Sequence, residues 1–198
     1  MGVPVIRVSG KQVLFVHVPK TGGSSIEARL AELGPVQLGA RNARNGFPCS
    51  PQHFHNTLLE RLFQEDDFDW AFMIVRHPVS RMVSQYRYET HKRRLRHPTQ
   101  PFTVWLRETL LARRDNPYLR DNHMRPQHEF EAFGAEVFRF EDGLDAPLAA
   151  FGRAVGVAVE GVLHWRKRSA PLTVEPSDAD IGMIRRAYAR DFERYGYD

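Results

Sequence analysis

The part of this chain that most constrains its fold is an apolar run and the glycine-containing loop that follows it. Residues 13–18 read Val-Leu-Phe-Val-His-Val, a short and nearly continuous apolar run rich in β-branched side chains. Such a run is typical of a central strand that is covered on both faces. Residues 19–25 then read Pro-Lys-Thr-Gly-Gly-Ser-Ser, and Ser24 and Glu27 have the spacing of a capping box, which predicts that a helix begins there. Strand, loop and helix in this order indicate an α/β fold.

The loop 19–25 is suited to binding a phosphate or sulfate group. Two adjacent glycines let the backbone curl tightly and approach a ligand closely. The free N–H groups of the first helical turn point into that curl, where the helix dipole favours an anion. A plain strand–turn–helix connection would explain a lone glycine pair, but here a lysine precedes the pair and hydroxyl residues flank it. The candidate anion ligands are Lys20, Thr21, Gly22, Gly23, Ser24 and Ser25.

The order of residues in this loop disfavours a site that hydrolyses ATP. A nucleoside triphosphatase loop reads Gly-x-x-x-x-Gly-Lys-Ser/Thr, with the lysine after the glycines. Here Lys20 precedes the glycines, and residue 18 is a valine rather than a leading glycine. The second apolar run, 70–75, is followed by Arg76 and not by an aspartate that could hold magnesium.

A second anion site is predicted where the apolar run 70–75 ends. This run reads as a strand, and Pro78 suits the first turn of the helix that follows it. The carboxyl ends of parallel strands meet at the edge of the sheet where α/β proteins bind ligands, so we expect Arg76 to lie near the loop 19–25. Arginine and a hydroxyl make a good phosphate receptor, and Ser84 lies on the same helix. The alternative is a structural salt bridge at Arg76 and an inert Ser84.

The remaining patterns complete an α/β domain with a central, mainly parallel sheet flanked by helices. Residues 136–140 predict a third strand, 145–155 a helix, and 178–195 a C-terminal helix. The stretches 35–50 and 97–125 are irregular and are expected to be loops with short helices. No repeat or long linker divides the chain, so we expect one domain over 1–198.

The motifs together resemble those of the sulfotransferase superfamily. Residues 15–25 are similar to its 5′-phosphosulfate loop, in the form found in carbohydrate sulfotransferases and many bacterial relatives. Residues 76–86 are similar to its 3′-phosphate motif, with Arg76 and Ser84 at the two contact positions, and the tail 188–197 also fits. The resemblance implies a P-loop nucleotide-kinase-like fold. It also implies transfer of a sulfuryl group from 3′-phosphoadenosine-5′-phosphosulfate to a hydroxyl or amine, with carbohydrate as the expected acceptor.

The resemblance implies roles for further residues. Arg168 and Ser169 fall in a late basic loop that closes over the nucleotide, although this segment departs from the usual pattern. The segment 122–127 resembles one that lines the acceptor side in relatives. There His123 and Arg125 are candidates for contact with an anionic acceptor, with a purely structural loop as an equal alternative.

The chemistry calls for a group that stabilises the leaving oxygen and for a general base. Lys20 is expected to neutralise the phosphate oxygen that departs. Relatives place a histidine base between the two nucleotide motifs, so His53 is the first candidate and His55 the second. A surface or helix-capping role is the alternative for either histidine. His17 is expected to pack within the strand or behind the loop. This chemistry requires no metal, and we expect no metal site because no nearby carboxylate or cysteine completes a ligand set with His53 and His55.

Composition narrows the setting of the protein. A single cysteine, Cys49, excludes an intrachain disulfide and favours a reducing, cytoplasmic location. No apolar run reaches the roughly 18 residues of a membrane span, and we expect no secretory leader. Residues 76–96 hold seven arginines and lysines against one glutamate, in a chain of net charge +4.

Two alternatives to a sulfotransferase stay open at this point. One is a nucleotide kinase-like P-loop enzyme. The other is a non-catalytic protein that binds a polyanion or nucleic acid through the basic segment 87–97, although nucleic acid is not the expected partner because no nucleic-acid fold motif accompanies that segment. The identity of the acceptor and the oligomeric state are not encoded in any pattern we can read.

Overall fold

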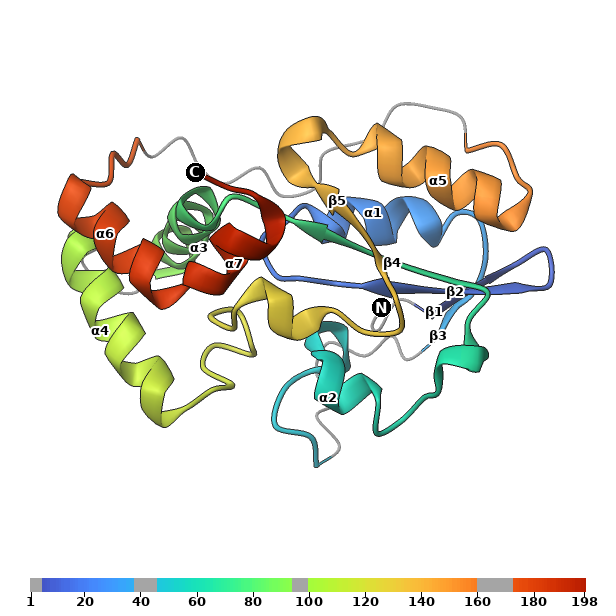
Figure 1. Cartoon of the computed structure of the whole chain (residues 1–198), viewed down its shortest axis with the longest axis horizontal. Coiled ribbons are helices and arrows are strands. Elements are labelled where there is room, and N and C mark those ends of the chain that lie inside the picture. The colour runs from blue at the N-terminus through green and yellow to red at the C-terminus, as the bar shows by residue number, and fades with distance from the viewer. Residues whose placement is uncertain (1–4, 38–45, 94–99, 160–172) are drawn as a thin grey trace.

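A twisted sheet of five strands forms the centre of the described chain (Figure 1). The computed structural model describes residues 5–37, 46–93, 100–159 and 173–198. The strands lie in the order β3-β1-β2-β4-β5. Their bounds are β1 Val5–Val8, β2 Lys11–Val16, β3 Val36–Gln37, β4 Trp70–Val75 and β5 Glu136–Arg139.

The expectation of a mainly parallel sheet is confirmed. Strands β2, β4 and β5 are parallel neighbours, with Phe15 opposite Phe72 and Phe72 opposite Glu136. Strand β1 is antiparallel to both β2 and β3, so β3 runs in the direction of β2. The sequence did not predict β1 and β3. Strand β1 joins β2 through a tight turn at Ser9 and Gly10, whose φ angles are 51° and 79°, as a two-residue hairpin turn requires.

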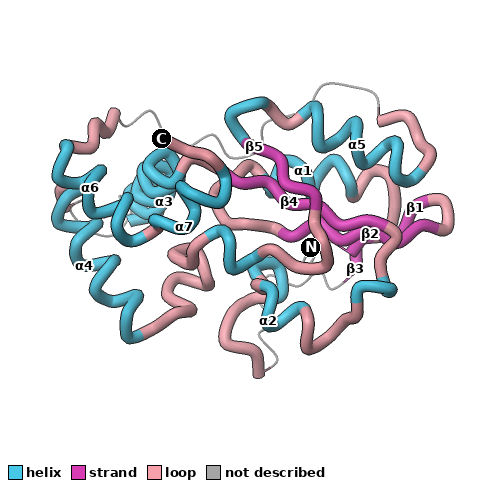
Figure 2. The backbone as a smooth tube through the Cα atoms, viewed as in Figure 1, coloured by secondary structure: helices cyan, strands magenta, loops and turns pink. Residues whose placement is uncertain are grey.

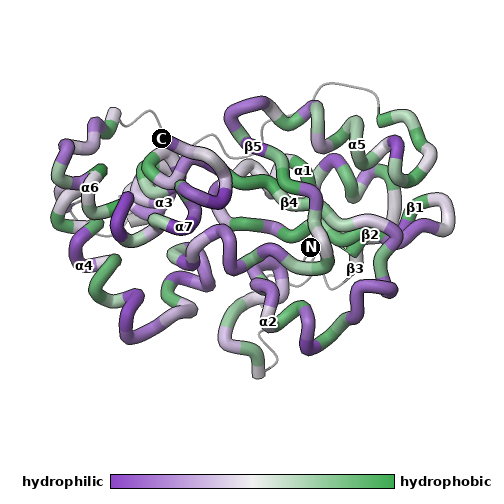
Figure 3. Tube along the Cα trace, in the orientation of Figure 1, coloured by the Kyte–Doolittle hydropathy of each residue, from purple (hydrophilic) through white to green (hydrophobic). Residues whose placement is uncertain are grey.

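Helices cover both faces of the sheet and form a separate group beside it (Figure 2). Strand β4 and the second half of β2 are almost entirely apolar (Figure 3). The helix bounds are α1 Gly23–Leu30, α2 Asn56–Leu59, α3 Pro78–Arg93, α4 Phe102–Asp115, α5 Asp145–Val155, α6 Asp178–Ala187 and α7 Ala189–Tyr195.

Three apolar clusters hold these layers together. On one face of the sheet, side chains of α1 and α5 such as Ile26 and Phe151 pack with Phe15 and Phe72. On the other face, α2 and the segment around Phe130 pack against inward residues of β2 and β4. Beside the sheet, helices α3, α4, α6 and α7 form the third cluster. Burial of apolar surface is the main force that fixes this arrangement.

Three local expectations were wrong. The region 97–125 contains α4, a helix of 14 residues, rather than only loops and short helices. The C-terminal helix is broken into α6 and α7 at Tyr188, whose hydroxyl donates to the carbonyl of Met124 at 3.0 Å. The capping box at Ser24 and Glu27 does not form, because α1 is capped by Gly22 without a side-chain hydrogen bond.

Candidate active site

The loop 19–25 follows β2, as the sequence predicted, and its last three residues form the start of α1. Lys20 and Gly22 have positive φ angles of 72° and 84°, which curl the backbone before the first helical N–H groups. Gly22 suits this conformation because it lacks a Cβ. Thr21 is fully buried, and its hydroxyl donates to the carbonyl of Val18 at 2.8 Å. The loop is thus held by one of its own side chains immediately before α1 begins.

Glu27 does not cap α1, and its carboxylate instead contacts His17 and Gln52 behind the loop. Its carboxylate is buried and lies 2.7 Å from Nδ1 of His17, while Nε2 of Gln52 donates to both of its oxygens at 2.9 and 2.7 Å. A buried carboxylate requires such partners to offset its desolvation. His17 therefore packs behind the loop, one of the two positions expected for it.

The ring of His17 explains why residue 23 of the loop is a glycine. A Cβ built on Gly23 would lie 2.4 Å from Nε2 of His17, far inside van der Waals contact. The ring cannot move away easily, since Glu27 and Gln52 hold its other nitrogen. The glycine pair thus serves two different needs, a left-handed backbone at Gly22 and close approach of a side chain at Gly23.

Arg81 connects the loop to the helical part of the molecule. Its guanidinium donates to three backbone carbonyls, those of Pro19 at 3.0 Å, Arg125 at 2.9 Å and His123 at 2.9 Å. Only 1% of the residue is exposed. This role could not be read from the sequence, because it depends on contacts that are distant in the chain.

Arg76 lies at the carboxyl end of β4 and reaches the loop. Its Nη1 donates to the carbonyl of Lys20 at 3.3 Å, and its guanidinium lies 4.4 Å from the centre of the Phe140 ring. Gln127 binds the backbone N–H and carbonyl of Arg76, both at 2.8 Å. The structure therefore brings together the end of β4 and the loop 19–25.

Two arginine Nε atoms near this point are buried without a hydrogen-bond partner. They belong to Arg76 and Arg87. Burial is the main cause that lowers the pKa of Arg76, and the positive charge of Arg87 acts in the same direction. Ser84 is half-buried on α3, three residues before Arg87, so the two share a helix face. Donors that are buried and unpaired fit an anionic ligand. The sequence reasoning did not select Arg87 as a ligand, although its spacing from Ser84 was a usable signal.

His53 is held by a carboxylate and lies among two other histidines. Its Nδ1 is 2.9 Å from Oδ2 of Asp121. Its ring makes edge contacts with His17, at 5.5 Å between centroids, and with His123, at 4.7 Å. Burial lowers the pKa of His53, while the hydrogen bond with Asp121 raises it and limits the shift.

A row of rings runs from His53 toward Lys20. His123 stacks on Tyr88, with centroids 6.1 Å apart, and Nζ of Lys20 lies 4.2 Å from the centre of the Tyr88 ring. Nδ1 of His123 is hydrogen-bonded to Gln85 at 2.8 Å. Burial lowers the pKa of His123 well below its ordinary value, and His53 and Lys20 add to this. The sequence reasoning missed Tyr88 and Gln85.

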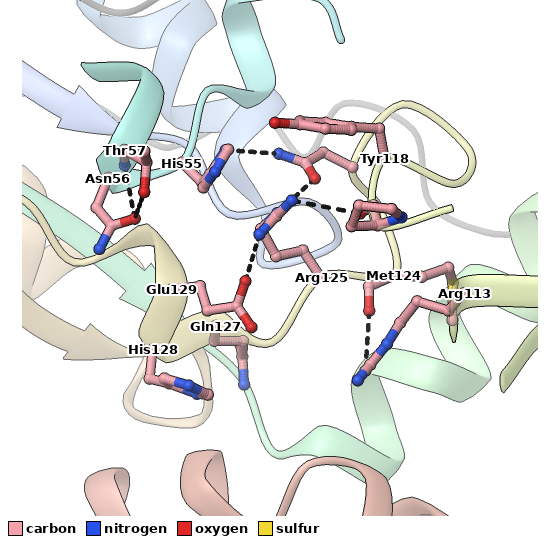
Figure 4. Close-up of polar contacts among 12 residues, drawn as sticks. His55, Asn56, Thr57, Arg113, Tyr118, Met124, Arg125, Gln127, His128 and Glu129 are labelled. Atoms are coloured by element: carbon pink, nitrogen blue, oxygen red, sulfur yellow. Dashed lines mark hydrogen bonds and ion pairs between the residues drawn. The ribbon is translucent and has the colours of Figure 1, made fainter. Parts of the chain in front are cut away.

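His55 lies in a different group of side chains, shown in Figure 4. Nδ2 of Asn122 lies 3.4 Å from its Nδ1, and its ring packs on Tyr118 at 5.8 Å. Burial and the charges of Arg125 and Arg61 lower the pKa of His55 to about 4. Arg125 is itself bound to Asn122 and Glu129. Its contacts therefore match the structural role that was left open for it.

Some of the predicted site residues cannot be placed in the site. Arg168, Ser169 and residues 94–97 of the basic segment lie outside the described residues. Across the part of the chain that is described, no group of three or more His, Cys, Asp or Glu side chains could hold a metal ion. In that same part, no helix combines the length and apolarity needed to cross a membrane.

Comparison with known families decides what kind of protein carries this site. The profile of the sulfotransferase family matches residues 5–198, nearly the whole chain. The chain belongs to the sulfotransferase family. It is therefore an enzyme that transfers a sulfuryl group to an acceptor. No curated protein and no solved structure gave a significant match. One edge of the sheet in this sulfotransferase carries the loop 19–25, Arg76 and the histidine row, by which we mean the rings of His53 and His123.

Proposed function

We propose that this sulfotransferase uses 3′-phosphoadenosine-5′-phosphosulfate as donor and transfers its sulfuryl group to an acceptor hydroxyl. The observation that carries this proposal is the contact between Arg76 and the loop, with Nη1 of Arg76 3.3 Å from the carbonyl of Lys20. This contact places a second candidate anion-binding region directly beside the loop, which suits a nucleotide with phosphate groups at both the 5′ and the 3′ position. ATP has no 3′-phosphate to bind at the second region.

Residues of the loop 19–25 would hold the 5′ end of the donor. The N–H groups at the start of α1 and the hydroxyls of Ser24 and Ser25 would donate to phosphate oxygens. Arg76 and Ser84 would bind the 3′-phosphate, and the unpaired Nε atoms of Arg76 and Arg87 support this assignment. The loop between β2 and α1, beside the parallel strand β4, also supports a P-loop nucleotide-kinase-like fold.

His53 would act as the general base and Lys20 as the group that stabilises the leaving oxygen. His53 would accept the proton of the acceptor hydroxyl. The acceptor oxygen then forms a bond to sulfur while the bond from sulfur to the phosphate oxygen breaks. The electron pair of that bond remains on adenosine 3′,5′-bisphosphate, where Lys20 would stabilise the negative charge. No metal takes part in this scheme.

His55 is the weaker candidate for the base. Its pKa of about 4 makes it a poor proton acceptor, since general bases work best with pKa values near the working pH. The pKa of His53 is lowered as well, but Asp121 opposes that shift. A carboxylate bound to Nδ1 also orients the ring, which is a common arrangement for histidine bases.

Carbohydrate is the acceptor we propose, and a reducing compartment such as the cytoplasm is the proposed location. Residues 1–198 would act as one sulfotransferase domain. Transfer of labelled sulfate from the donor onto a panel of glycans, phenols and small alcohols would identify the acceptor class. The chain is expected to label a glycan hydroxyl, and exclusive labelling of a non-carbohydrate would overturn this part of the proposal.

The donor is tested by isothermal titration calorimetry with three nucleotides. Adenosine 3′,5′-bisphosphate is expected to bind far more tightly than ADP or ATP, and binding should not require magnesium. Equal affinity for the three nucleotides, or a need for magnesium, would contradict the assignment and favour a nucleotide kinase-like site.

A further inference from the structure

The carboxylate of Asp121 contacts both Ser50 and His53, which lie at the two ends of one short turn. Its Oδ2 lies 2.9 Å from Nδ1 of His53 and accepts from the hydroxyl of Ser50 at 2.6 Å. Its Oδ1 accepts from the backbone N–H of Ser50, also at 2.6 Å. Although burial alone would raise it, these hydrogen bonds hold the pKa of Asp121 well below its usual range. Asp121 is therefore an ionised carboxylate at neutral pH.

An ionised carboxylate determines which nitrogen of His53 carries the proton. A carboxylate can only accept, so Nδ1 of His53 must donate to it. In a neutral imidazole the other nitrogen then holds a lone pair. Nε2 of His53 is thus left as the acceptor, in a ring that lies between His17 and His123. A general base at this position needs that tautomer.

The backbone that carries Asp121 has an uncommon conformation. Arg120, Asp121 and Asn122 are three consecutive residues other than glycine with positive φ angles, of 55°, 61° and 68°. Such conformations persist only where surrounding contacts enforce them, and they cluster at functional sites. We refer to residues 120–122 as the left-handed turn.

Contacts on both sides of Asp121 hold the left-handed turn in place. Nε of Arg120 lies 2.7 Å from Glu89, and its Nη1 donates to Thr109 at 2.7 Å. On the other side, Nδ2 of Asn122 donates to the carbonyl of His53 at 2.8 Å. The turn is therefore anchored to α3 and α4 at one end and to the backbone of His53 at the other.

We propose that Asp121 is a positioning residue for His53, and that the left-handed turn exists to deliver its carboxylate to Nδ1. The proposal rests on the proposed function of His53 as base. Asp121 fixes the tautomer in which Nε2 can accept the acceptor's proton. It then pairs with the imidazolium that forms, while His123, whose pKa is lowered by burial, stays neutral beside it. Among the described residues, the charge of Glu27 on α1 also acts on His53, and the charge of Lys20 acts on the neighbouring His123.

A purely structural role for Asp121 makes a different prediction. In that case the carboxylate would only tie Ser50 to the left-handed turn, and the tautomer of His53 would not depend on it. Asp121→Asn separates the two roles. Asparagine tolerates positive φ angles, and its carbonyl oxygen can still accept from the N–H of Ser50. Its amide group would donate to Nδ1 of His53 and so move the ring proton to Nε2.

The tautomer can be measured by ¹⁵N NMR of the imidazole nitrogens in the free protein, with no substrate present. The signals of His53 among the nine histidines are assigned by their loss in His53→Gln. The wild type is expected to carry the proton on Nδ1, and Asp121→Asn on Nε2. A wild-type proton on Nε2 would overturn the proposal without any variant, as would the same tautomer in both proteins.

Turnover supplies the second measurement, on the glycan or other hydroxyl compound that the wild type labels best. Asp121→Asn is expected to lower kcat by about 10²–10⁴-fold, the contribution of general base catalysis. Its affinity for adenosine 3′,5′-bisphosphate should stay within about twofold. The matched control is Asp115→Asn, an exposed carboxylate at the end of α4, which should leave kcat and the His53 tautomer unchanged.

Different results would contradict the role of His53 as base and the role of Asp121 in positioning it. If His53→Gln keeps wild-type turnover, His53 is not the base and the proposed function needs revision. If His53→Gln loses turnover but Asp121→Asn keeps both turnover and tautomer, only the positioning role is wrong. Wild-type turnover in Asp121→Asn despite a changed tautomer would also refute the positioning role.

Discussion

Nε of Arg81 donates a hydrogen bond to the carbonyl of Pro19 at 3.0 Å, which ties α3 to the loop 19–25. The same guanidinium binds the carbonyls of His123 and Arg125, so one buried side chain joins the loop, the helix and the segment beside the histidine row. Hydrogen bonds from a charged group each contribute about 1.5–3 kcal/mol. We therefore expect Arg81 to control both stability and the geometry of the site.

Arg81→Ala is expected to lower the free energy of unfolding by about 3 kcal/mol or more, because three backbone carbonyls lose a charged donor. It should also weaken binding of adenosine 3′,5′-bisphosphate. Urea unfolding and calorimetry would measure the two effects. Arg190→Ala, at an exposed position of α7, is the control and should change neither. Wild-type stability in Arg81→Ala would mean that the three contacts are replaceable by water.

Gly23→Ala tests the close approach of His17 to the loop. The added Cβ would lie 2.4 Å from Nε2 of a ring that cannot easily withdraw. Overpacking of this kind costs about 1–3 kcal/mol, and the displaced loop should bind adenosine 3′,5′-bisphosphate less tightly. Gly182→Ala is the matched control in α6, where the new Cβ would meet only Arg186 at 3.5 Å. That change should raise the unfolding free energy by about 0.5–1 kcal/mol. Equal behaviour of the two variants would contradict the steric argument.

Removal of Arg76 or Arg87 tests the proposed 3′-phosphate site. Each single alanine variant should weaken binding of adenosine 3′,5′-bisphosphate by about 10–100-fold, the loss expected for one charged hydrogen bond. Binding of ADP should change much less, because ADP lacks the 3′-phosphate. Titration of both nucleotides into each variant measures the difference. A similar loss for the two nucleotides would place these arginines at another part of the ligand.

The buried histidines predict a loss of stability in mild acid. The pKa of His55 is lowered from 6.5 to about 4 in the folded state, so the unfolded chain binds a proton more readily between these values. The unfolding free energy should therefore fall as the pH falls from about 6.5 to about 4. His53 and His123 have pKa values shifted in the same direction and should add to the effect. Thermal unfolding over this range measures it.

His55→Gln provides the comparison for the pH experiment. Glutamine keeps an acceptor for Asn122 but cannot be protonated, so this variant should show a weaker dependence of melting temperature on pH than the wild type. An unchanged dependence would mean that His55 does not contribute to the acid sensitivity.

Much of the fold could be predicted because its main signals are local. The apolar run 70–75 coincides with β4, and 145–155 coincides with α5. Strands β1 and β3 were missed because both are short, and β3 is specified by pairing with β1, which lies much earlier in the chain. The break at Tyr188 was missed for a related reason. Its side chain is fixed by the carbonyl of Met124, far away in the sequence, while the apolar spacing continues through it.

The sequence by itself determined the glycine-containing loop 19–25 of this sulfotransferase. A strand, a glycine pair and a helix start are properties of neighbouring residues, so the curl and its lysine could be read from the order of residues 13–25. Only the tertiary structure decided what surrounds that loop. Arg81 binds Pro19 across 62 positions, and His53 binds Asp121 across 68. Such pairs form because packing brings their elements together, and no local pattern of side chains encodes that meeting.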